Sequence, residues 1–424
     1  MSRLHAHRAQ PGPLLAALLM LAPMAFAAPP DLPRAASPEA EGIDPAALAR
    51  LLEDAKASQS SCVVILKNGK LVGEWSFGKA PTRIEAMSVT KSVVGLAVLK
   101  LLADGKLPSL DVPVHQYFPE WNQGRKKDVT LRHLVTHTSG LQSDRTTEEI
   151  YRSPDFVKLA LAAELSTAPG TAFHYNNKAV NLLAGIVQKA SGKRLDRYLA
   201  DALFRPMGIT DFTWTLDDAG NPHVMAGVQL RPRDLAKLGQ LLIDGGVWQG
   251  RRLLPAEWVK QATTPGEGVY SAGGMLWWPQ EAWARLTVDD SLLTAWKAAG
   301  VPATLIQEVS RLKGRTFADR KAYFEALGPL RPAVEKEVGG RNLRPATVEV
   351  GPGVGFNSNG DLGQYLLVLP EQRLVAVRMY AHPEGSREQP DEAVYFEDFI
   401  PRALALVGLG QPPAPTGEAA TAPR

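Results

Sequence analysis

The chain has 424 residues, of which 45% are hydrophobic and 21% are charged, values that are ordinary for a globular protein with a sizeable core. Its formal net charge is only +3, and its densest basic run, residues 125–127, is followed at once by Asp128, so the charge pattern gives no reason to expect a nucleic-acid partner. The one cysteine, Cys62, cannot form an intramolecular disulfide and lies in an apolar run typical of a buried strand.

The first 27 residues have the pattern of an export signal. Arg3 and Arg8 precede an apolar run over 14–26, and the Ala-Phe-Ala sequence at 25–27 has the small residues that a signal peptidase requires. No later stretch reaches about 18 uninterrupted apolar residues, the length that spans a bilayer. We therefore expect a periplasmic or secreted protein with no membrane span in the mature chain.

Residues 28–43 are rich in Pro and Ala and are interpreted as a linker. Asp44 followed by Pro45 then opens a helix, because Asp caps a helix and Pro is favoured in its first turn. Two apolar runs flank Asn68-Gly69, the pair that best tolerates the positive φ angles of a two-residue turn, and so predict a hairpin.

The next helix carries the candidate nucleophile. Residues 92–99 have no charge and are apolar on every face, which predicts a helix enclosed on all sides. Ser88 and Lys91 lie about one turn apart on the same face, close enough for the amine to meet the hydroxyl. A serine hydroxyl needs a neighbouring base, and burial can lower a lysine pKa by ~3 to 5 units toward the neutral form.

The Ser-x-x-Lys pattern occurs twice more, beginning at Ser76 and at Ser310. Ser76 ends a strand-like run, and Ser310 lies in a charged helical stretch. Only Ser88 opens an apolar helix, where the free N–H groups of the first turn can bind an anion. Context therefore favours Ser88.

Residues 107 to about 245 are predicted to be mostly helical. Within them His133 and His137 are four apart and could chelate a metal on one helix face. No Glu occupies the position next to the first histidine as in His-Glu-x-x-His, and no third ligand suggests itself. No metal or other cofactor is expected.

Tyr175-Asn176-Asn177 is the only Tyr-x-Asn sequence in the chain and leads into an amphipathic helix. A phenol beside a cationic lysine loses its proton more easily, so Tyr175 could take the Ser88 proton and return it to a leaving group. Asn177 could orient the lysine or a substrate carbonyl. The alternatives are that Tyr175 packs in the core and that Asn177 merely caps the helix, and His174 could line the pocket or lie at the surface.

Strands return at 364–369 and 374–379, joined as a second hairpin. The order of elements predicts an α/β (α+β) fold: an antiparallel sheet formed from both chain ends and flanked by helices, with a mainly helical domain inserted. Residues from about 280 to 345 are charged and helix-favouring, and are interpreted as a helical insertion that forms a lid or side wall over the cleft. The Pro- and Ala-rich residues 411–424 are predicted to be disordered.

Ser88-Val89-Thr90-Lys91 and Tyr175-Asn176-Asn177, in this order, resemble the first two motifs of serine hydrolases of the beta-lactamase and penicillin-binding protein fold. The resemblance covers most of a domain at 44–410 and is greatest to the branch of class C beta-lactamases, D-alanyl-D-alanine peptidases, esterases and 6-aminohexanoate-dimer hydrolases. It implies that Ser88 forms an acyl-enzyme, that Lys91 and Tyr175 are its acid/base partners and that Asn177 supports them. The implied substrate is a small ester, amide or peptide.

The third family motif, usually Lys-Thr-Gly, should fall just before Gly363, but residues 355–360 contain no lysine and Gly355 occupies the expected position. A backbone N–H near Ser358 could still complete an oxyanion hole, since that role needs no side chain. Without the cation that helps hold a substrate carboxylate, we expect an esterase or small-amide hydrolase. The alternatives are a class C-like beta-lactamase or D-Ala-D-Ala carboxypeptidase in which Arg341 or Arg344 replaces the lysine, and a non-catalytic ligand-binding domain. The pair Trp277-Trp278 could line the cleft or lie in the core.

Overall fold

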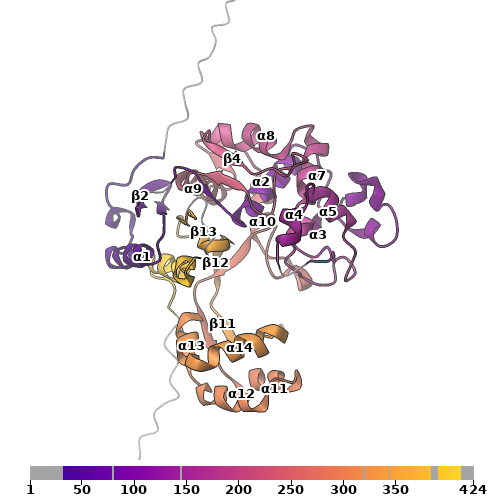
Figure 1. Cartoon of the computed structure of the whole chain (residues 1–424). Helices are drawn as coiled ribbons and strands as arrows, with labels where there is room; N and C mark the ends of the chain where they lie inside the picture. Colours follow the sequence, from indigo (N-terminus) through magenta and orange to yellow (C-terminus); the bar gives the residue numbers. More distant parts are fainter. Residues whose placement is uncertain are drawn as a thin grey trace, which may run out of the picture.

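The computed structural model describes residues 32–78, 81–143, 146–318, 320–341, 343–382 and 390–411. The predicted export signal and almost all of the predicted tail lie outside these residues. A main body of sheet and helices carries a smaller lobe below it in Figure 1. No helix in the described ranges is long and apolar enough to cross a membrane.

A six-stranded antiparallel sheet forms the centre of the main body, in the order β2-β1-β14-β13-β12-β8. Its strands are β1 (Cys62–Lys67), β2 (Lys70–Ser76), β8 (Trp278–Glu281), β12 (Gly353–Gly360), β13 (Gln364–Leu369) and β14 (Leu374–Met379). Both predicted hairpins are confirmed, the first turning at Asn68 and Gly69 with φ of 54° and 77°. Because β1 pairs with β14, the two chain ends share one sheet, as the predicted fold class requires.

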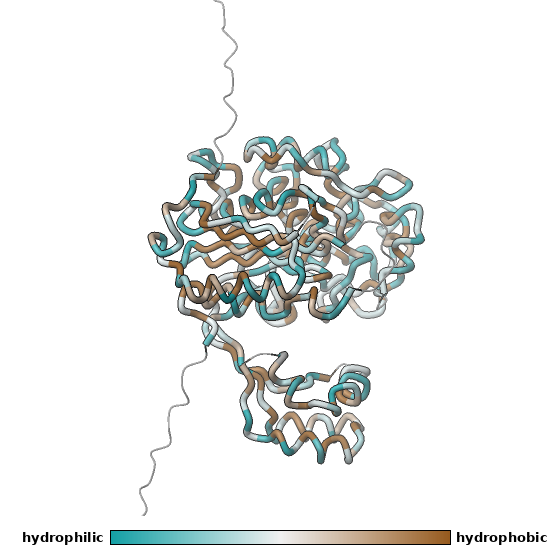
Figure 2. Tube along the Cα trace, turned by 60° about the vertical axis from the view of Figure 1, so that its left-hand side comes forward, coloured by the Kyte–Doolittle hydropathy of each residue, from teal (hydrophilic) through white to brown (hydrophobic). Residues whose placement is uncertain are grey.

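Helices cover both faces of this sheet. The inner strands are buried on both sides, as the hydrophobic strands of the main body in Figure 2 illustrate. In β1, Val63 and Ile65 pack with α1 (Pro45–Ala57) and α15 (Phe399–Ala405), whereas the alternate residues pack into the larger core on the other face. That second face carries α2 (Val89–Ala103) and α9 (Pro232–Ile243).

The helical part beyond α2 belongs to the same large core. Its helices are α3 (Leu131–Val135), α4 (Glu148–Arg152), α5 (Phe156–Ala162), α6 (Asn177–Val180), α7 (Leu182–Ser191), α8 (Leu195–Leu199) and α10 (Ala256–Thr263). Short strands accompany them: β3 (Ile84–Glu85), β4 (Phe212–Trp214), β5 (Val228–Leu230), β6 (Val247–Trp248) and β7 (Arg251–Arg252). The predicted helical region 107–245 thus also supplies α9, which packs on the sheet rather than among the other helices.

The described part of the predicted linker is ordered against the sheet. Its Pro33 carbonyl accepts a hydrogen bond from the Leu71 N–H at 2.7 Å, and the Glu41 carboxylate binds the Lys70 ammonium at 2.7 Å. Asp44 then caps α1 by accepting from the Ala46 N–H at 2.8 Å, as the sequence predicts. Residues 32–43 therefore extend the edge of the main body.

Between β8 and β12 the chain forms a lobe with its own core. Its elements are β9 (Ala284–Thr287), α11 (Asp290–Ala298), α12 (Ala303–Val309), β10 (Thr316–Phe317), α13 (Arg320–Leu327), α14 (Arg331–Glu337) and β11 (Thr347–Val350). Trp296 and Tyr323 are fully buried in a cluster separate from those that cover the sheet. The chain enters and leaves at Ala282 and Pro352, whose N–H and C=O are hydrogen-bonded at 2.8 Å.

The lobe lies on the side of the sheet that carries α1 and α15 (Figure 1). A cavity of about 710 Å³ separates them, lined by Phe324 and Arg331 of the lobe and by Asp54 of α1, and Arg331 reaches Glu392 at 3.4 Å. Ser88 begins a helix on the opposite face. The interpretation of this insertion as a lid over the cleft is therefore corrected: in this arrangement it does not cover Ser88.

Replacing 284–350 with a two-residue Asn-Gly turn should leave a folded and active main body, because the lobe has its own core and its two ends already face each other. Soluble expression, the thermal transition and hydrolysis of a short-chain p-nitrophenyl ester would check this. Insoluble protein would instead show that the main body needs the lobe to fold.

Candidate active site

Ser88 lies directly before α2, and the structure brings Lys91 to it. The Lys91 Nζ lies 3.0 Å from the Ser88 Oγ and donates a second hydrogen bond to the Met225 carbonyl at 2.7 Å. The one-turn spacing in the sequence thus becomes a direct contact between amine and hydroxyl.

Lys91 is buried, with 2% of its surface exposed, and no carboxylate in the described part of the chain pairs with it. Burial lowers the pKa of its ammonium group well below the usual 10.5, because a charge removed from water without a counter-ion is unfavourable. A neutral amine in contact with a serine hydroxyl can accept its proton.

Tyr175 lies beside Lys91. The Lys91 Nζ lies 4.8 Å from the centre of the Tyr175 ring. Burial raises the pKa of Tyr175 to about 12, and a hydrogen bond with Ser88 opposes that shift only in part. The pKa of Tyr175 is therefore above its ordinary value, which differs from the expectation of a phenol that loses its proton easily.

The end of β12 lies against the backbone of the nucleophile. A Cβ atom on Gly360 would fall 2.9 Å from the Ser88 nitrogen and 2.8 Å from the Ala86 oxygen, distances that a side chain cannot occupy. Ser358, two residues earlier, is buried and its hydroxyl bonds to the Ser92 hydroxyl at 2.6 Å. The end of β12 at Gly360 is thus packed directly against the Ser88 backbone.

Gly355, the position at which the third-motif lysine was expected, lies away from Ser88. Gly355 lies in β12 five residues before Gly360, where it pairs with Gln280 of β8. It is therefore distant from the end of the strand that contacts the Ser88 backbone. β12 nevertheless contains no lysine. Arg341 binds Glu337 within the lobe, and Arg344 also belongs to the lobe, so neither replaces a cation beside Ser88.

A buried arginine secures the turn that follows Gly360. The Arg378 guanidinium donates to the carbonyls of Leu362 and Gly363 at 2.7 and 2.8 Å, and to the Ser60 hydroxyl at 2.8 Å. Burial lowers the pKa of Arg378 to about 10, which still leaves it charged at neutral pH. The turn is therefore attached to the body of the sheet.

The Tyr-x-Asn sequence works differently from its prediction. Asn176, not Asn177, caps α6 by accepting from the Ala179 N–H at 2.8 Å. The Asn177 side chain makes no hydrogen bond with the described residues, although its carbonyl accepts one from Asn181. Asn177 therefore has no contact in this structure that would orient Lys91.

Asn181 is the residue that the sequence analysis missed. Its Oδ1 accepts from the N–H groups of Val224 and Met225 at 2.9 and 3.2 Å, and the Met225 carbonyl in turn holds Lys91. The sequence could have indicated this role, because Asn181 lies in an apolar stretch and a buried asparagine needs hydrogen-bond partners inside the protein.

The two histidines do not form a metal site. His133 accepts from the Thr130 N–H and caps α3, whereas His137 is buried beside Tyr175. No group of three metal-ligating side chains occurs among the residues that the structure describes. His174 is exposed, and its N–H donates to the His137 carbonyl at 2.8 Å.

The tryptophan pair divides between the two expected roles. Trp277 is buried and packs edge-on against Phe356. Trp278 lies 6.1 Å from the rings of both Phe173 and Tyr175, measured between centroids. Since Phe173 and Tyr175 are partly exposed, these rings form an aromatic wall beside Ser88.

Four residues around the site have the left-handed backbone conformation that side chains disfavour. Met87, His137, Leu276 and Leu362 have φ between 46° and 63°. Such strain persists only where the surrounding structure enforces it, and it is concentrated at functional sites. At these four positions the packing of the chain therefore enforces the backbone geometry.

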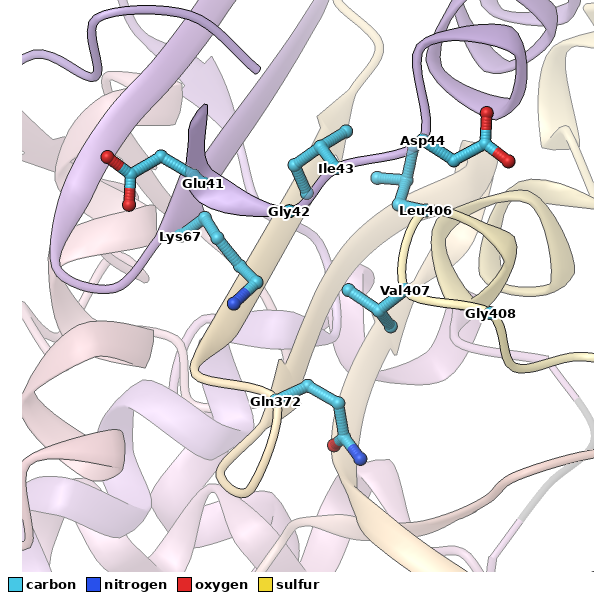
Figure 3. Close-up of a pocket in the computed structure, with 9 residues that line it drawn as sticks. All are labelled: Glu41, Gly42, Ile43, Asp44, Lys67, Gln372, Leu406, Val407 and Gly408. Carbon is cyan, nitrogen blue, oxygen red and sulfur yellow. The ribbon is translucent and has the colours of Figure 1, made fainter. Parts of the chain in front are cut away.

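The other candidate positions lack these features. Ser76 is exposed at the end of β2, and Ser310 lies in the lobe, where Lys313 binds Asp290. A hollow of about 440 Å³ lies beside the β1–β2 hairpin (Figure 3), and its charged groups have structural partners: Glu41 binds Lys70 and Asp44 caps α1. It offers no nucleophile.

The comparisons with known proteins agree with this geometry. A family model described as Beta-lactamase matches residues 48–397. The chain belongs to the beta-lactamase family.

Individual members of the beta-lactamase family are distant. Protein flp of Staphylococcus aureus is 27% identical over 187 residues, which are 40% of this chain and 37% of that protein. PbpX of Bacillus subtilis, provisionally named a penicillin-binding protein, is 24% identical over 51% of this chain and 63% of its own. The chain therefore matches less than two thirds of the length of these relatives.

Solved structures support the fold. A protein of Bacillus anthracis, provisionally named a 6-aminohexanoate-dimer hydrolase, superimposes with a TM-score of 0.57 at 18% identity, over 86% of this chain and 83% of its own. An octameric penicillin-binding protein homologue from Pyrococcus abyssi has a TM-score of 0.51 at 18% identity, over 83% and 75%. These confirm a beta-lactamase-like fold.

Gly360→Ala should lower kcat/KM by roughly tenfold to a hundredfold, because a methyl group forced into a closed contact costs ~1 to 3 kcal/mol. Gly353→Ala, in the same strand, is the matched control, since its Cβ would meet no atom within 4 Å. Equal activity of the two variants would contradict the close approach of β12 to Ser88.

Proposed function

We propose that this protein is an exported serine hydrolase that cleaves an ester or small amide through an acyl-enzyme at Ser88. The observation that carries the proposal is the contact of 3.0 Å between the Ser88 Oγ and the buried Lys91 amine, which pairs with no carboxylate among the described residues.

In acylation, Lys91 accepts the Ser88 proton while the Ser88 Oγ bonds to the substrate carbonyl carbon. The resulting oxyanion lies beside the Ser88 N–H at the start of α2, where helix N–H groups and the helix dipole favour negative charge. The end of β12 near Gly360 lines the same position and is the proposed source of a second backbone N–H.

Collapse of the tetrahedral species breaks the bond to the leaving group. The Tyr175 phenol donates its proton to the departing oxygen or nitrogen, and the Lys91 ammonium returns a proton to Tyr175. Water then attacks the acyl carbonyl carbon and gives a proton to Lys91. The bond from that carbon to the Ser88 Oγ breaks, the Lys91 ammonium returns the proton to the Ser88 Oγ, and the acid is released. These roles use Lys91 in its neutral form and Tyr175 in its protonated form, the states that burial favours.

The surroundings favour a substrate without a carboxylate. β12 carries no lysine, and the two arginines considered as replacements belong to the lobe. The partly exposed rings of Phe173 and Tyr175, with Trp278, instead offer apolar surface. An uncharged ester or amide loses nothing at such a site, whereas a carboxylate loses a charge-assisted contact.

Ser88→Ala should abolish turnover by ~10⁴-fold or more, because the nucleophile and its partners act as a unit. It should also abolish covalent labelling by a fluorophosphonate, which a non-catalytic binding domain would not show. Ser76→Ala and Ser310→Ala are the controls with the same local pattern. Activity in Ser88→Ala, or its loss in either control, would refute the assignment.

A short-chain p-nitrophenyl ester should have a higher kcat/KM than nitrocefin. The missing charge-assisted contact to the beta-lactam carboxylate is worth ~1.5 to 3 kcal/mol, roughly ten- to a hundredfold. Both substrates would be measured on one sample of purified protein. A clear preference for nitrocefin would favour the beta-lactamase alternative.

A further inference from the structure

His137 holds the main chain on both sides of Tyr175. Its carbonyl accepts a hydrogen bond from the His174 N–H at 2.8 Å, and its Nδ1 accepts one from the Asn176 N–H at 3.1 Å. These are the residues directly before and after Tyr175. One residue thus determines where the loop presents its phenol.

The His137 ring also packs against the phenol itself. The centroids of the two rings are 4.6 Å apart and their planes are inclined by 33°. The imidazole is stacked on Trp278 at 6.0 Å and is only 2% exposed. Tyr175 therefore has little freedom to turn away from the Lys91 Nζ, which lies 4.8 Å from its ring centre.

His137 is not suited to accept a proton. Because its Nδ1 accepts the Asn176 N–H, the neutral ring carries its hydrogen on Nε2. Burial, and to a smaller extent the charge of Lys91, lower the pKa of His137 to about 3. Its Nε2 has no hydrogen-bond partner among the described residues, so the ring is held by Nδ1 and by stacking.

The position demands three properties at once. Its φ of 56° is tolerated by His and Asn better than by most residues. The Asn176 N–H needs a hydrogen-bond acceptor at residue 137 that lies close to the backbone. The Tyr175 ring packs against a flat ring at the same residue. Histidine meets all three, although its unpaired buried Nε2 lowers stability. Stability alone does not account for a residue with that defect.

We propose that His137 is a positioning residue that holds Tyr175 in place for proton transfer to the leaving group. The proposal rests on the proposed function, in which Tyr175 is the proton donor. If it is right, loss of His137 should slow the hydrolysis of those substrates whose leaving group needs a proton from Tyr175. An alkoxide must be protonated as it departs, whereas p-nitrophenolate leaves without help.

The test compares kcat/KM for an ethyl ester and a p-nitrophenyl ester of the same acid in the full chain. His137→Asn keeps an acceptor and loses the ring, and His137→Phe keeps a ring and loses the acceptor. General-acid catalysis contributes about 10²- to 10⁴-fold, so both variants should lose about tenfold or more on the ethyl ester. The p-nitrophenyl ester should change much less.

Tyr175→Phe should show the same selective loss, larger in size, and adding His137→Phe to it should cause little further loss, because the two act through one group. His133→Phe is the control, since His133 lies four residues earlier, in α3, and contacts Thr130 instead. Equal losses on both esters, or unchanged activity, would overturn the positioning role. An inactive wild-type protein would instead overturn the proposed function.

A measurement on the unmodified protein covers the case in which the His137 variants fail to fold. Nitrogen-15 NMR of labelled histidine should show His137 with its proton on Nε2. A ring that carries its proton on Nδ1 could not accept the Asn176 N–H and would refute the proposal.

Discussion

The burial of one amine without a counter-charge is the constraint on which the site depends. Lys91 lies in a helix that is apolar all round, between the sheet and the helical part of the chain. Burial lowers the pKa of the Lys91 ammonium group and so favours the neutral amine that the proposed mechanism needs within reach of Ser88. Desolvation also raises the pKa of the Tyr175 phenol, which favours the protonated form that the proposed mechanism uses.

The remaining parts of the site are held by contacts from several elements. Asn181 fixes the segment whose Met225 carbonyl binds Lys91. Arg378 fixes the turn after Gly360, which lies against the Ser88 backbone. His137 holds the loop that presents Tyr175. Strained backbone at four positions around the site indicates that this packing, rather than local preference, sets the geometry.

The lobe at 284–350 shows how such a fold accommodates a large insertion. It enters and leaves through neighbouring residues at the end of β8 and the start of β12, and it buries its own apolar side chains. β12 contains eight residues, from Gly353 to Gly360, and its seven residue-to-residue steps at ~3.3 Å each make roughly 23 Å. The chemistry and the insertion thus lie at opposite ends of one strand.

The sequence by itself determined the features that depend on local geometry. The Asn68-Gly69 turn, the capping of α1 by Asp44, the fully apolar helix and the contact between Ser88 and Lys91 all follow from rules that operate within about one helical turn. The antiparallel sheet also followed, because two hairpins at opposite ends of the chain had to bury their apolar faces together.

Only the tertiary structure decided what depends on distance between remote segments. The Met225 carbonyl, 134 residues beyond Lys91, holds its amine, and no local pattern announces that contact. The direction in which the pKa of Tyr175 shifts depends on the packing around its ring, and the contact of Gly360 with the Ser88 backbone depends on a few ångströms of approach between a strand and a helix. Residue spacing carries no such information, because desolvation and close packing arise only when the whole chain has folded.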